Sequence, residues 1–370
     1  MIVRTSLGAA ALVTAVALSA AFSHSALADP FVDPRADRIP AIETNAGFTG
    51  LPRDPACQAA KLVATGGAAP QSRYTLAVRW TGFANYEFAY AGHVILLDAY
   101  FDRGSNYPPL GFKAADVKKA DVILLGHAHF DQMSDAASIA LRTKAVVVGA
   151  PVTTDKLKTQ GVPGSQIRTV IGRAEEKLFF DGFTVQPVLA LHGQPDKRIT
   201  EVMEGAINSL APKPTPQQQA EEKAIQDRGT FDPRVIAEGT IAYIITFDDG
   251  FRIVYRDSGG HITEYEKAAF KNSPGVDLAI VALSADFLNP LVATQALEHE
   301  RVYKPDVFMP AHHDAGFSGH TPLWRATEPV FQALKDADPL LVTASREYRE
   351  PTCFDTQVNI ARGRKRVAPP

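Results

Sequence analysis

The sequence predicts an α+β fold, a four-layer αββα sandwich, and three observations lead to this prediction. The chain has two β-rich halves, in which short apolar runs typical of strands alternate with segments typical of helices. Tight turns containing glycine join several neighbouring runs as hairpins. A hydrophobic content of 45% is enough for a large buried core.

The elements follow in order along the chain. Strands are expected at residues 76–80, 86–90 and 94–97, and Ala91 and Gly92 form the turn between the last two. A buried apolar run at 121–125 then leads through a loop to a helix that begins near Asp135. The later elements are a strand at 145–148, a helix at 153–160, a strand near 167–170, and two hairpins that turn at 181–182 and 248–250.

The loop after the run at 121–125 holds His127, His129 and Asp131. Residues i and i+2 of an extended segment point the same way, so the two imidazoles can bind one cation together. Imidazole nitrogens and carboxylate oxygens are the usual ligands of zinc and of neighbouring transition metals. The alternative is that these histidines are only solvated at the mouth of a loop.

Three more ligand-type residues each follow a strand-like run: His192, Asp257 and His312. Side chains at the ends of several strands can be held at one site by a rigid scaffold. His313 alternates to the other face of an extended segment, so His312 is the preferred ligand. The sequence therefore predicts a metal site along one edge of the sheets.

The order HxHxDx, His, Asp, Pro-x-His resembles the metallo-β-lactamase-fold hydrolase superfamily over roughly residues 74–320. Within it, the chain looks most like the branch of the ascorbate-phosphate lactonases and the N-acyl-phosphatidylethanolamine phospholipases D. The similarity lies in residues 78–85, the strand that ends in Asp98, the signature around Asp257, and residues 309–312. The resemblance implies the αββα sandwich of the metallo-β-lactamase type.

The three imidazoles of His127, His129 and His192 are expected to hold one zinc tightly and to leave a position for water. The resemblance implies a second metal held by Asp131, Asp257 and His312, with Asp257 bridging the two. Asp131 and Asp257 are therefore the expected catalytic residues.

Gln132 departs from the family pattern, which has a histidine at this position. An amide oxygen is a poorer ligand for zinc than an imidazole nitrogen, so the second site is expected to be weak or to hold manganese. Asp98 is expected either to fix a histidine tautomer or to be a turn residue.

Composition and missing motifs exclude several classes of protein. A formal net charge of −3 argues against nucleic acid as a partner. The chain contains no Gly-x-Ser-x-Gly elbow, P-loop or dinucleotide fingerprint, which disfavours serine hydrolases, kinases and nicotinamide enzymes. The expected partner is a small-molecule substrate, and the sequence does not set the oligomeric state.

The first 28 residues have the pattern of a signal peptide, with Arg4, an apolar run, and a cleavage site after Ala28. The protein is therefore expected in the periplasm or secreted, without stable insertion in a membrane. Cys57 and Cys353 flank the core and would reach an oxidising compartment, so they are expected either as a disulfide or as two buried thiols.

The expected organisation has three parts after the signal peptide is set aside. Residues 29–73 form an irregular extension, 74–325 the hydrolase domain, and 326–370 a C-terminal helix and tail. Within the domain, residues 193–239 read as an insertion that is either a lid over the site or an ordinary surface segment.

The function expected from the sequence is an exported metal-dependent hydrolase. A metal-bound hydroxide would attack an ester, lactone, amide or phosphodiester bond, and the resemblance leans toward lactone or phosphodiester. The alternative is a catalytically inactive metal- or ligand-binding protein of the same fold, with Gln132 as the trace of lost turnover.

Overall fold

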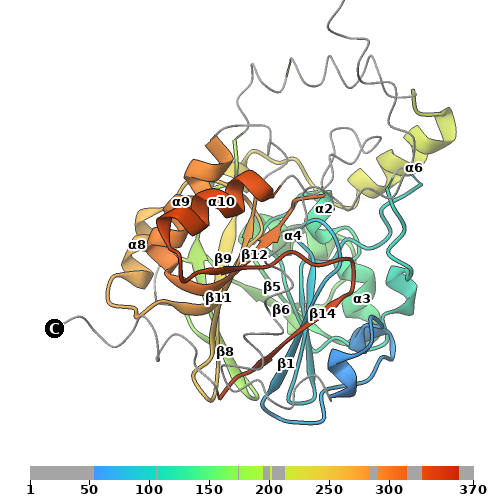
Figure 1. The fold of residues 1–370 in the computed structure, drawn as a ribbon. Helices are drawn as coiled ribbons and strands as arrows, with labels where there is room; N and C mark the ends of the chain where they lie inside the picture. The colour runs from blue at the N-terminus through green and yellow to red at the C-terminus, as the bar shows by residue number, and fades with distance from the viewer. Residues whose placement is uncertain are drawn as a thin grey trace, which may run out of the picture.

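The computed structural model describes residues 54–105, 107–173, 175–194, 201, 213–283, 291–314 and 327–357. Two seven-stranded sheets face each other, and helices cover their outer sides (Figure 1). The predicted αββα sandwich is confirmed. The expected signal peptide lies outside the described residues. None of the helices described in the structure has both the length and the apolar character needed to span a membrane.

The first sheet has the strand order β14-β1-β2-β3-β4-β5-β6. Its pairs are antiparallel from β14 to β3 and parallel from β3 to β6. The strands are β1 (Thr75–Trp80), β2 (Tyr86–Tyr90), β3 (His93–Leu97), β4 (Val122–Leu124), β5 (Val146–Gly149), β6 (Ile167–Thr169) and β14 (Pro351–Asp355). Parallel neighbours need crossover connections, and α3 (Ala136–Thr143) and α4 (Pro151–Thr159) supply them here.

The second sheet has the order β13-β12-β11-β10-β9-β8-β7 and repeats the pattern, with antiparallel pairs from β7 to β10 and parallel pairs from β10 to β13. Its strands are β7 (Leu178–Phe180), β8 (Phe183–Leu189), β9 (Ile241–Phe247), β10 (Arg252–Arg256), β11 (Val276–Ala282), β12 (Pro305–Ala311) and β13 (Val342–Thr343). The crossovers contain α8 (Glu264–Phe270), α9 (Leu291–Tyr303) and α10 (Glu328–Ala337). Both predicted hairpins are present.

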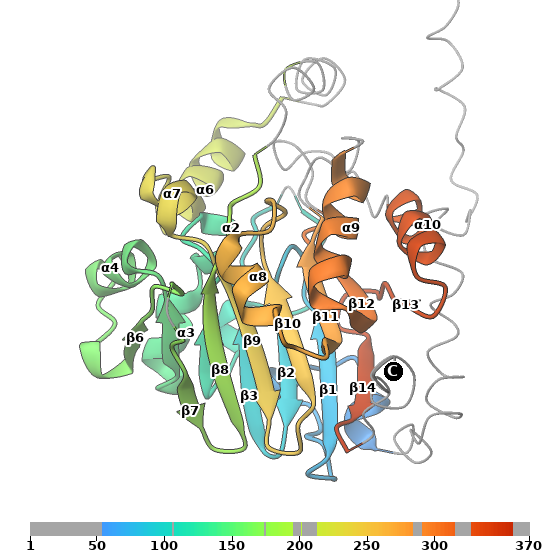
Figure 2. The same cartoon turned by 90° about the vertical axis from the view of Figure 1, so that its left-hand side faces the viewer.

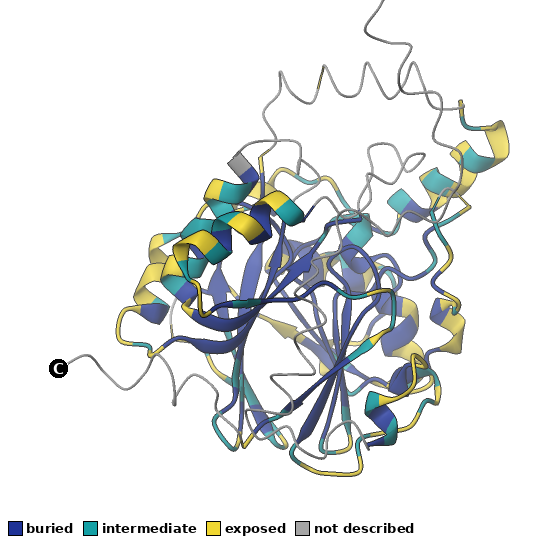
Figure 3. Cartoon of the chain, in the orientation of Figure 1, coloured by how far each residue is buried: buried dark blue, intermediate teal, exposed yellow. Residues whose placement is uncertain are grey.

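The main core lies between the sheets, and a second core lies between the second sheet and its helices (Figures 2 and 3). Successive residues of a strand point to opposite faces, which is why one strand serves both cores. On β10, Ile253 belongs to the core between the sheets and Val254 to the core under α8, α9 and α10. The central strands are therefore buried on both faces, and their ends are left to carry polar chemistry.

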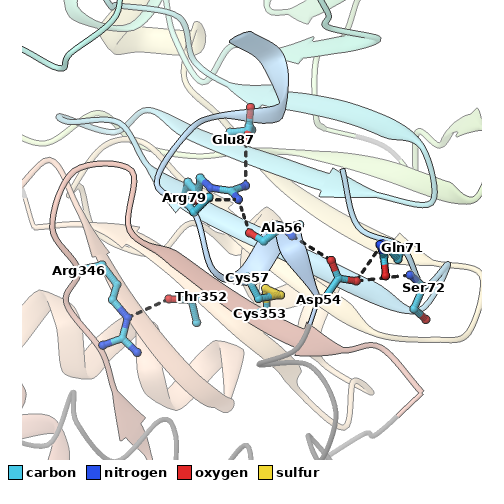
Figure 4. Close-up of a disulfide and its surroundings, with 11 residues drawn as sticks. Asp54, Ala56, Cys57, Gln71, Ser72, Arg79, Glu87, Arg346, Thr352 and Cys353 are labelled. Atoms are coloured by element: carbon cyan, nitrogen blue, oxygen red, sulfur yellow. Dashed lines mark hydrogen bonds and ion pairs between the residues drawn. A yellow bond between two sulfur atoms is a disulfide. The ribbon is translucent and has the colours of Figure 1, made fainter. Parts of the chain in front are cut away.

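The N-terminal extension and the C-terminal segment meet at one edge of the first sheet. Cys57 and Cys353 form a disulfide, which confirms the first of the two alternatives expected from the sequence. Strand β14 pairs with β1 beside it (Figure 4). Buried Glu87 accepts the backbone N–H groups of Val63 and Ala64 and pairs with Arg79 at 3.1 Å. The extension is thus anchored to β1 and β2.

The C-terminal segment contains the expected helix, α10, but it also supplies strands to both sheets, β13 and β14. The 193–239 insertion contains α6 (Pro216–Gln226) and α7 (Arg234–Glu238). Residues 195–200 and 202–212 of this insertion lie outside the described residues.

Candidate metal centre

The proposed ligands lie at the carboxyl ends of four strands, which bring them to one edge of the sandwich. His127 and His129 follow β4, His192 follows β8, Asp257 follows β10, and His312 follows β12. Short one-turn α2 (Phe130–Met133) carries Asp131 and Gln132 directly after the two histidines. The structure therefore brings all seven of the residues predicted from the sequence to one region of the fold.

Three imidazole nitrogens converge. Nδ1 of His129 lies 3.0 Å from Nε2 of His127 and 3.2 Å from Nε2 of His192. Among the described residues, this is the one group of three His, Cys, Asp or Glu side chains whose ligand atoms all lie within 4.8 Å of one another. Such a set leaves room for a cation at the centre of the three rings.

The outer nitrogens of two of these rings have partners that fix their orientation. Nδ1 of His192 lies 2.6 Å from the carbonyl of Gly193, and Nδ1 of His127 lies 2.5 Å from Oδ2 of buried Asp257. Each contact leaves Nε2 of the ring facing the centre. Histidines that bind metals are commonly oriented in this way.

Burial, reinforced by the charge of neighbouring His127, lowers the pKa of both His129 and His192 to about 3. Both rings are therefore neutral at neutral pH, which is the form that binds a metal.

The residues expected to hold a second metal form two separate pairs. Nε2 of His312 lies 2.8 Å from Oδ2 of Asp131, while Asp257 is bonded to His127. The amide nitrogen of Gln132 donates to the same Asp131 oxygen at 3.1 Å. Burial alone would raise the pKa of Asp131, but the hydrogen bond and charge of His312 outweigh it and hold the pKa well below its ordinary value.

Three polar atoms of these residues are buried and make no hydrogen bond in the described structure: Asp257 Oδ1, Gln132 Oε1 and His312 Nδ1. An unpaired buried polar atom costs free energy, so each of them calls for a partner. Carboxylate, amide and imidazole groups can all bind a cation, but among the described residues only the three imidazoles converge closely enough to form a site.

The backbone at the start of the metal loop requires a glycine. A Cβ atom on Gly126 would lie 2.0 Å from Cγ of Asp257, so the carboxylate that orients His127 occupies the space of a side chain. Asp98 holds the same point from the other side by accepting the N–H of Gly126 at 2.9 Å.

In the described structure, the side chain of Asp98 bonds Gly126 and Tyr255 and no histidine; its second oxygen accepts the hydroxyl of Tyr255 at 2.6 Å. The structure thus favours the turn-residue alternative, with φ at +57°, and assigns the orienting of a histidine to Asp257 instead. Burial, together with the charge of Asp257, raises the pKa of Asp98 well above its ordinary value.

The neighbours of His312 differ from those of the triad. Its φ is +55°, and its N–H donates to the carbonyl of Phe83 at 2.7 Å. The N–H of Phe83 donates in turn to Asp314, which also accepts Arg103 at 3.0 Å and the hydroxyl of Tyr348. Adjacent His313 turns away and stacks on Trp80, with ring centroids 4.1 Å apart.

An aromatic wall, which the sequence analysis missed, stands beside the site. The ring of Phe231 lies 5.3 Å from the ring of His129 and 6.1 Å from Phe130. Phe130 in turn packs against Tyr100 at 5.7 Å. Phe231 belongs to the polar 193–239 insertion, where one apolar residue gives little signal without the fold.

The described part of the insertion is attached to the metal loop by hydrogen bonds and close packing. The N–H of Thr230 donates to the carbonyl of Ala128 at 2.8 Å, and Arg228 pairs with buried Asp135 at 2.8 Å. A Cβ on Gly229 would lie 2.3 Å from the nitrogen of Phe130. That the insertion opens and closes as a lid stays a prediction.

Residues 93–313 match a family described as the beta-lactamase superfamily domain. A UPF0173 metal-dependent hydrolase from Polynucleobacter asymbioticus is 24% identical over 258 residues, which are 69% of this chain and 78% of that protein. Another from Lawsonia intracellularis is 32% identical over 93 residues, 25% of this chain and 39% of that protein.

Among solved structures, Igni18, a metallo hydrolase from the archaeon Ignicoccus hospitalis, superposes with a TM-score of 0.52 at 16% identity. The alignment covers 76% of this chain and 98% of that chain, and at this identity it shows a shared fold.

Proposed function

The chain belongs to the beta-lactamase superfamily, in its metallo-β-lactamase fold, and from this premise we propose that it is an exported, zinc-dependent hydrolase of a small-molecule substrate. The observation that carries the proposal is the convergence of one nitrogen each from His127, His129 and His192. The metal-dependent hydrolases among its relatives support the same reaction class.

The donor set fits zinc. Zinc–nitrogen bonds of 2.0–2.1 Å in a tetrahedron place the ligand nitrogens about 3.3 Å apart. The separations of 3.0 and 3.2 Å are close to that value. Nδ1 of His129 carries at most one hydrogen, so it cannot make a full hydrogen bond to both neighbouring rings at once. Three protein ligands leave a fourth position for water or substrate, as in catalytic zinc sites.

A cation bound by the three rings would lower the pKa of a water molecule and polarise the scissile bond. The chain's own residues supply positioning. Asp257 and the carbonyl of Gly193 hold His127 and His192 in the tautomers that face the centre. Asp131, ionised and held by Gln132 and His312, is placed to accept a hydrogen bond from the attacking water.

His312 has a second role in this proposal. Its Nε2–H is hydrogen-bonded to Asp131 and stabilises that carboxylate in the ionised form. Asp131 can then take the proton that the attacking water loses and pass the same proton to the departing group. Ester, lactone, amide and phosphodiester bonds all fit this chemistry, because each needs an activated water and a protonated leaving group. The branch resemblance leans toward lactone or phosphodiester.

Export is supported by the signal-like first 28 residues and by the disulfide, because disulfides persist in oxidising compartments. Zinc is the proposed metal because three imidazoles with one open position are a known ligand set of catalytic zinc sites. Imidazole also binds iron and copper, so the identity of the metal has to be measured. Metal analysis of protein purified from the periplasm or medium tests both points.

The test of the function is metal content and hydrolysis measured together on the purified protein. His192→Ala should lose the tight zinc and all turnover of a panel of chromogenic esters, lactones and phosphodiesters. His261→Ala is the matched control, because this histidine is exposed and its ring pairs with Glu298 instead of the triad. Full zinc and normal turnover in His192→Ala would refute the site.

The same experiment separates the alternative function. Zinc bound by the wild type with no hydrolysis of any substrate in the panel would favour a metal- or ligand-binding protein of this fold.

A further inference from the structure

We propose that Phe231 recognises an apolar group of the substrate, an aromatic ring or a short alkyl chain next to the scissile bond. The inference rests on the proposed function, since it places this contact beside the metal. It adds a class of substrate and one specificity-determining residue.

The first observation is the exposure of apolar surface at the site. Phe231 is 63% exposed. Its ring lies 5.3 Å from that of His129. Single exposed apolar residues are common on any protein, but this one lies against a ligand of the proposed metal. A substrate placed at the metal would cover apolar surface there.

The second observation is that Phe231 is held in place. Two residues before it, Gly229 packs so closely on the metal loop that a Cβ would lie 2.3 Å from Phe130 N and 2.8 Å from His129 C. Between them, the N–H of Thr230 is bonded to Ala128. A side chain on such a fixed backbone loses little entropy when it binds a ligand, which favours selectivity.

The third observation concerns what lies behind and beside the ring. Phe130 supports Phe231 at 6.1 Å, so the surface continues as an aromatic wall. The arginines of the same segment are already paired, Arg228 with Asp135 at 2.8 Å and Arg234 with Asp232 at 2.7 Å. The aspartates neutralise the positive charges of both arginines, so the aromatic wall suits an apolar group of the substrate better than an anionic one.

The experiment compares two hydroxamates that differ only in their apolar part, acetohydroxamate and 4-phenylbutyrohydroxamate. Both bind zinc through the same hydroxamate atoms. The ratio of their dissociation constants on the zinc-loaded full chain therefore measures how much the apolar part gains from its contact with the aromatic wall. We expect wild type to bind the phenyl compound roughly tenfold more tightly. Phe231→Ala should reduce this ratio to near one, and Phe231→Leu should keep most of it.

Phe179→Ala is the matched control. Phe179 is 77% exposed but lies on edge strand β7 among residues that form no part of the site, so the ratio should stay at the wild-type value. Zinc content, measured by metal analysis, should be the same in all these variants.

The outcomes separate this inference from the function on which it rests. If neither hydroxamate binds zinc-loaded wild type, the proposed function fails, and the inference fails with it. If both bind equally, or if Phe231→Ala leaves the ratio unchanged, this inference alone is overturned. Loss of zinc in Phe231→Ala would make Phe231 a positioning residue for His129, which also overturns it.

Discussion

The two sides of the metal centre are built differently. On one side, the Nε2 atoms of His127 and His192 both lie within 3.2 Å of Nδ1 of His129, and His127 and His192 are oriented by outer partners. On the other, Asp131, Gln132 and His312 form a small network of their own while Asp257 is bonded to His127. One side is ready to receive a cation, and the other would have to exchange existing contacts first.

The supports of the two sides also come from different parts of the chain. The triad depends on Gly126, Asp98 and Tyr255, which lie in or beside the central strands. His312 depends on Phe83, Asp314 and Tyr348, and Tyr348 belongs to the segment that leads into β14 and the disulfide. A change that disturbs one side should therefore leave the other largely intact.

The largest effect is expected for Gly126→Ala, which acts on the triad side. The new Cβ would displace the carboxylate of Asp257 and with it His127, so zinc affinity should fall about 100-fold or more. Zinc titration of apo-protein measures it. Gly164→Ala, at a position with nothing within 4 Å of the added atom, is the control. Wild-type affinity in Gly126→Ala would contradict the packing described here.

A second prediction concerns the disulfide. Cys57→Ser with Cys353→Ser should lower the free energy of unfolding by about 3 kcal/mol, because the unfolded chain is no longer closed into a loop. Denaturant unfolding measures this, with wild type under reducing conditions as a comparison. The first equivalent of zinc should bind as in wild type. Loss of that zinc would show that the triad also depends on the C-terminal segment.

Tyr255→Phe should have an intermediate effect. It removes the hydroxyl that donates to Asp98 at 2.6 Å and also lies 3.0 Å from the carbonyl of Ala84, at a cost of about 1–3 kcal/mol in stability. Because Asp98 holds Gly126, zinc affinity should also fall, by about tenfold. Tyr303→Phe, which removes a buried hydroxyl bonded to Glu266, should cost stability alone. Equal zinc affinity in the two variants would argue against the role of Asp98.

The smallest effect is expected for Gln132→His, which acts on the second side. An added imidazole beside Asp131 should raise affinity for a second equivalent of zinc by about tenfold and leave the first unchanged. Calorimetric titration of apo-protein with zinc resolves the two. If wild type already binds two zinc ions equally tightly and the variant does the same, Gln132 does not weaken the site.

The sequence was informative for the ligand-type residues, because each of them follows a strand. Apolar runs that each end in His or Asp predicted both the two sheets and the residues gathered at their edge. The disulfide was one of two expectations. What local pattern could not supply was pairing between distant segments. Residues 351–355 begin with a proline and read as tail, and only the free edge of β1 makes them a strand.

The partner of Asp98 and the position of Phe231 were missed for a related reason. Tyr255 is separated from Asp98 by 157 residues, and Phe231 follows a segment of mostly polar composition. Which side chains face each other across the two sheets depends on register, and a one-residue change in register would have sent Tyr255 to the other core.

The bond between Cys57 and Cys353 joins positions 296 residues apart, so nearly the whole described chain lies inside one covalent ring. A protease that cuts a single peptide bond anywhere in that ring opens it without releasing a piece. The nicked molecule keeps its mass, apart from one added water, until the disulfide is reduced. In a protein exported as proposed, a first cut by a protease would therefore leave the strands, the helices and the metal ligands attached to one another.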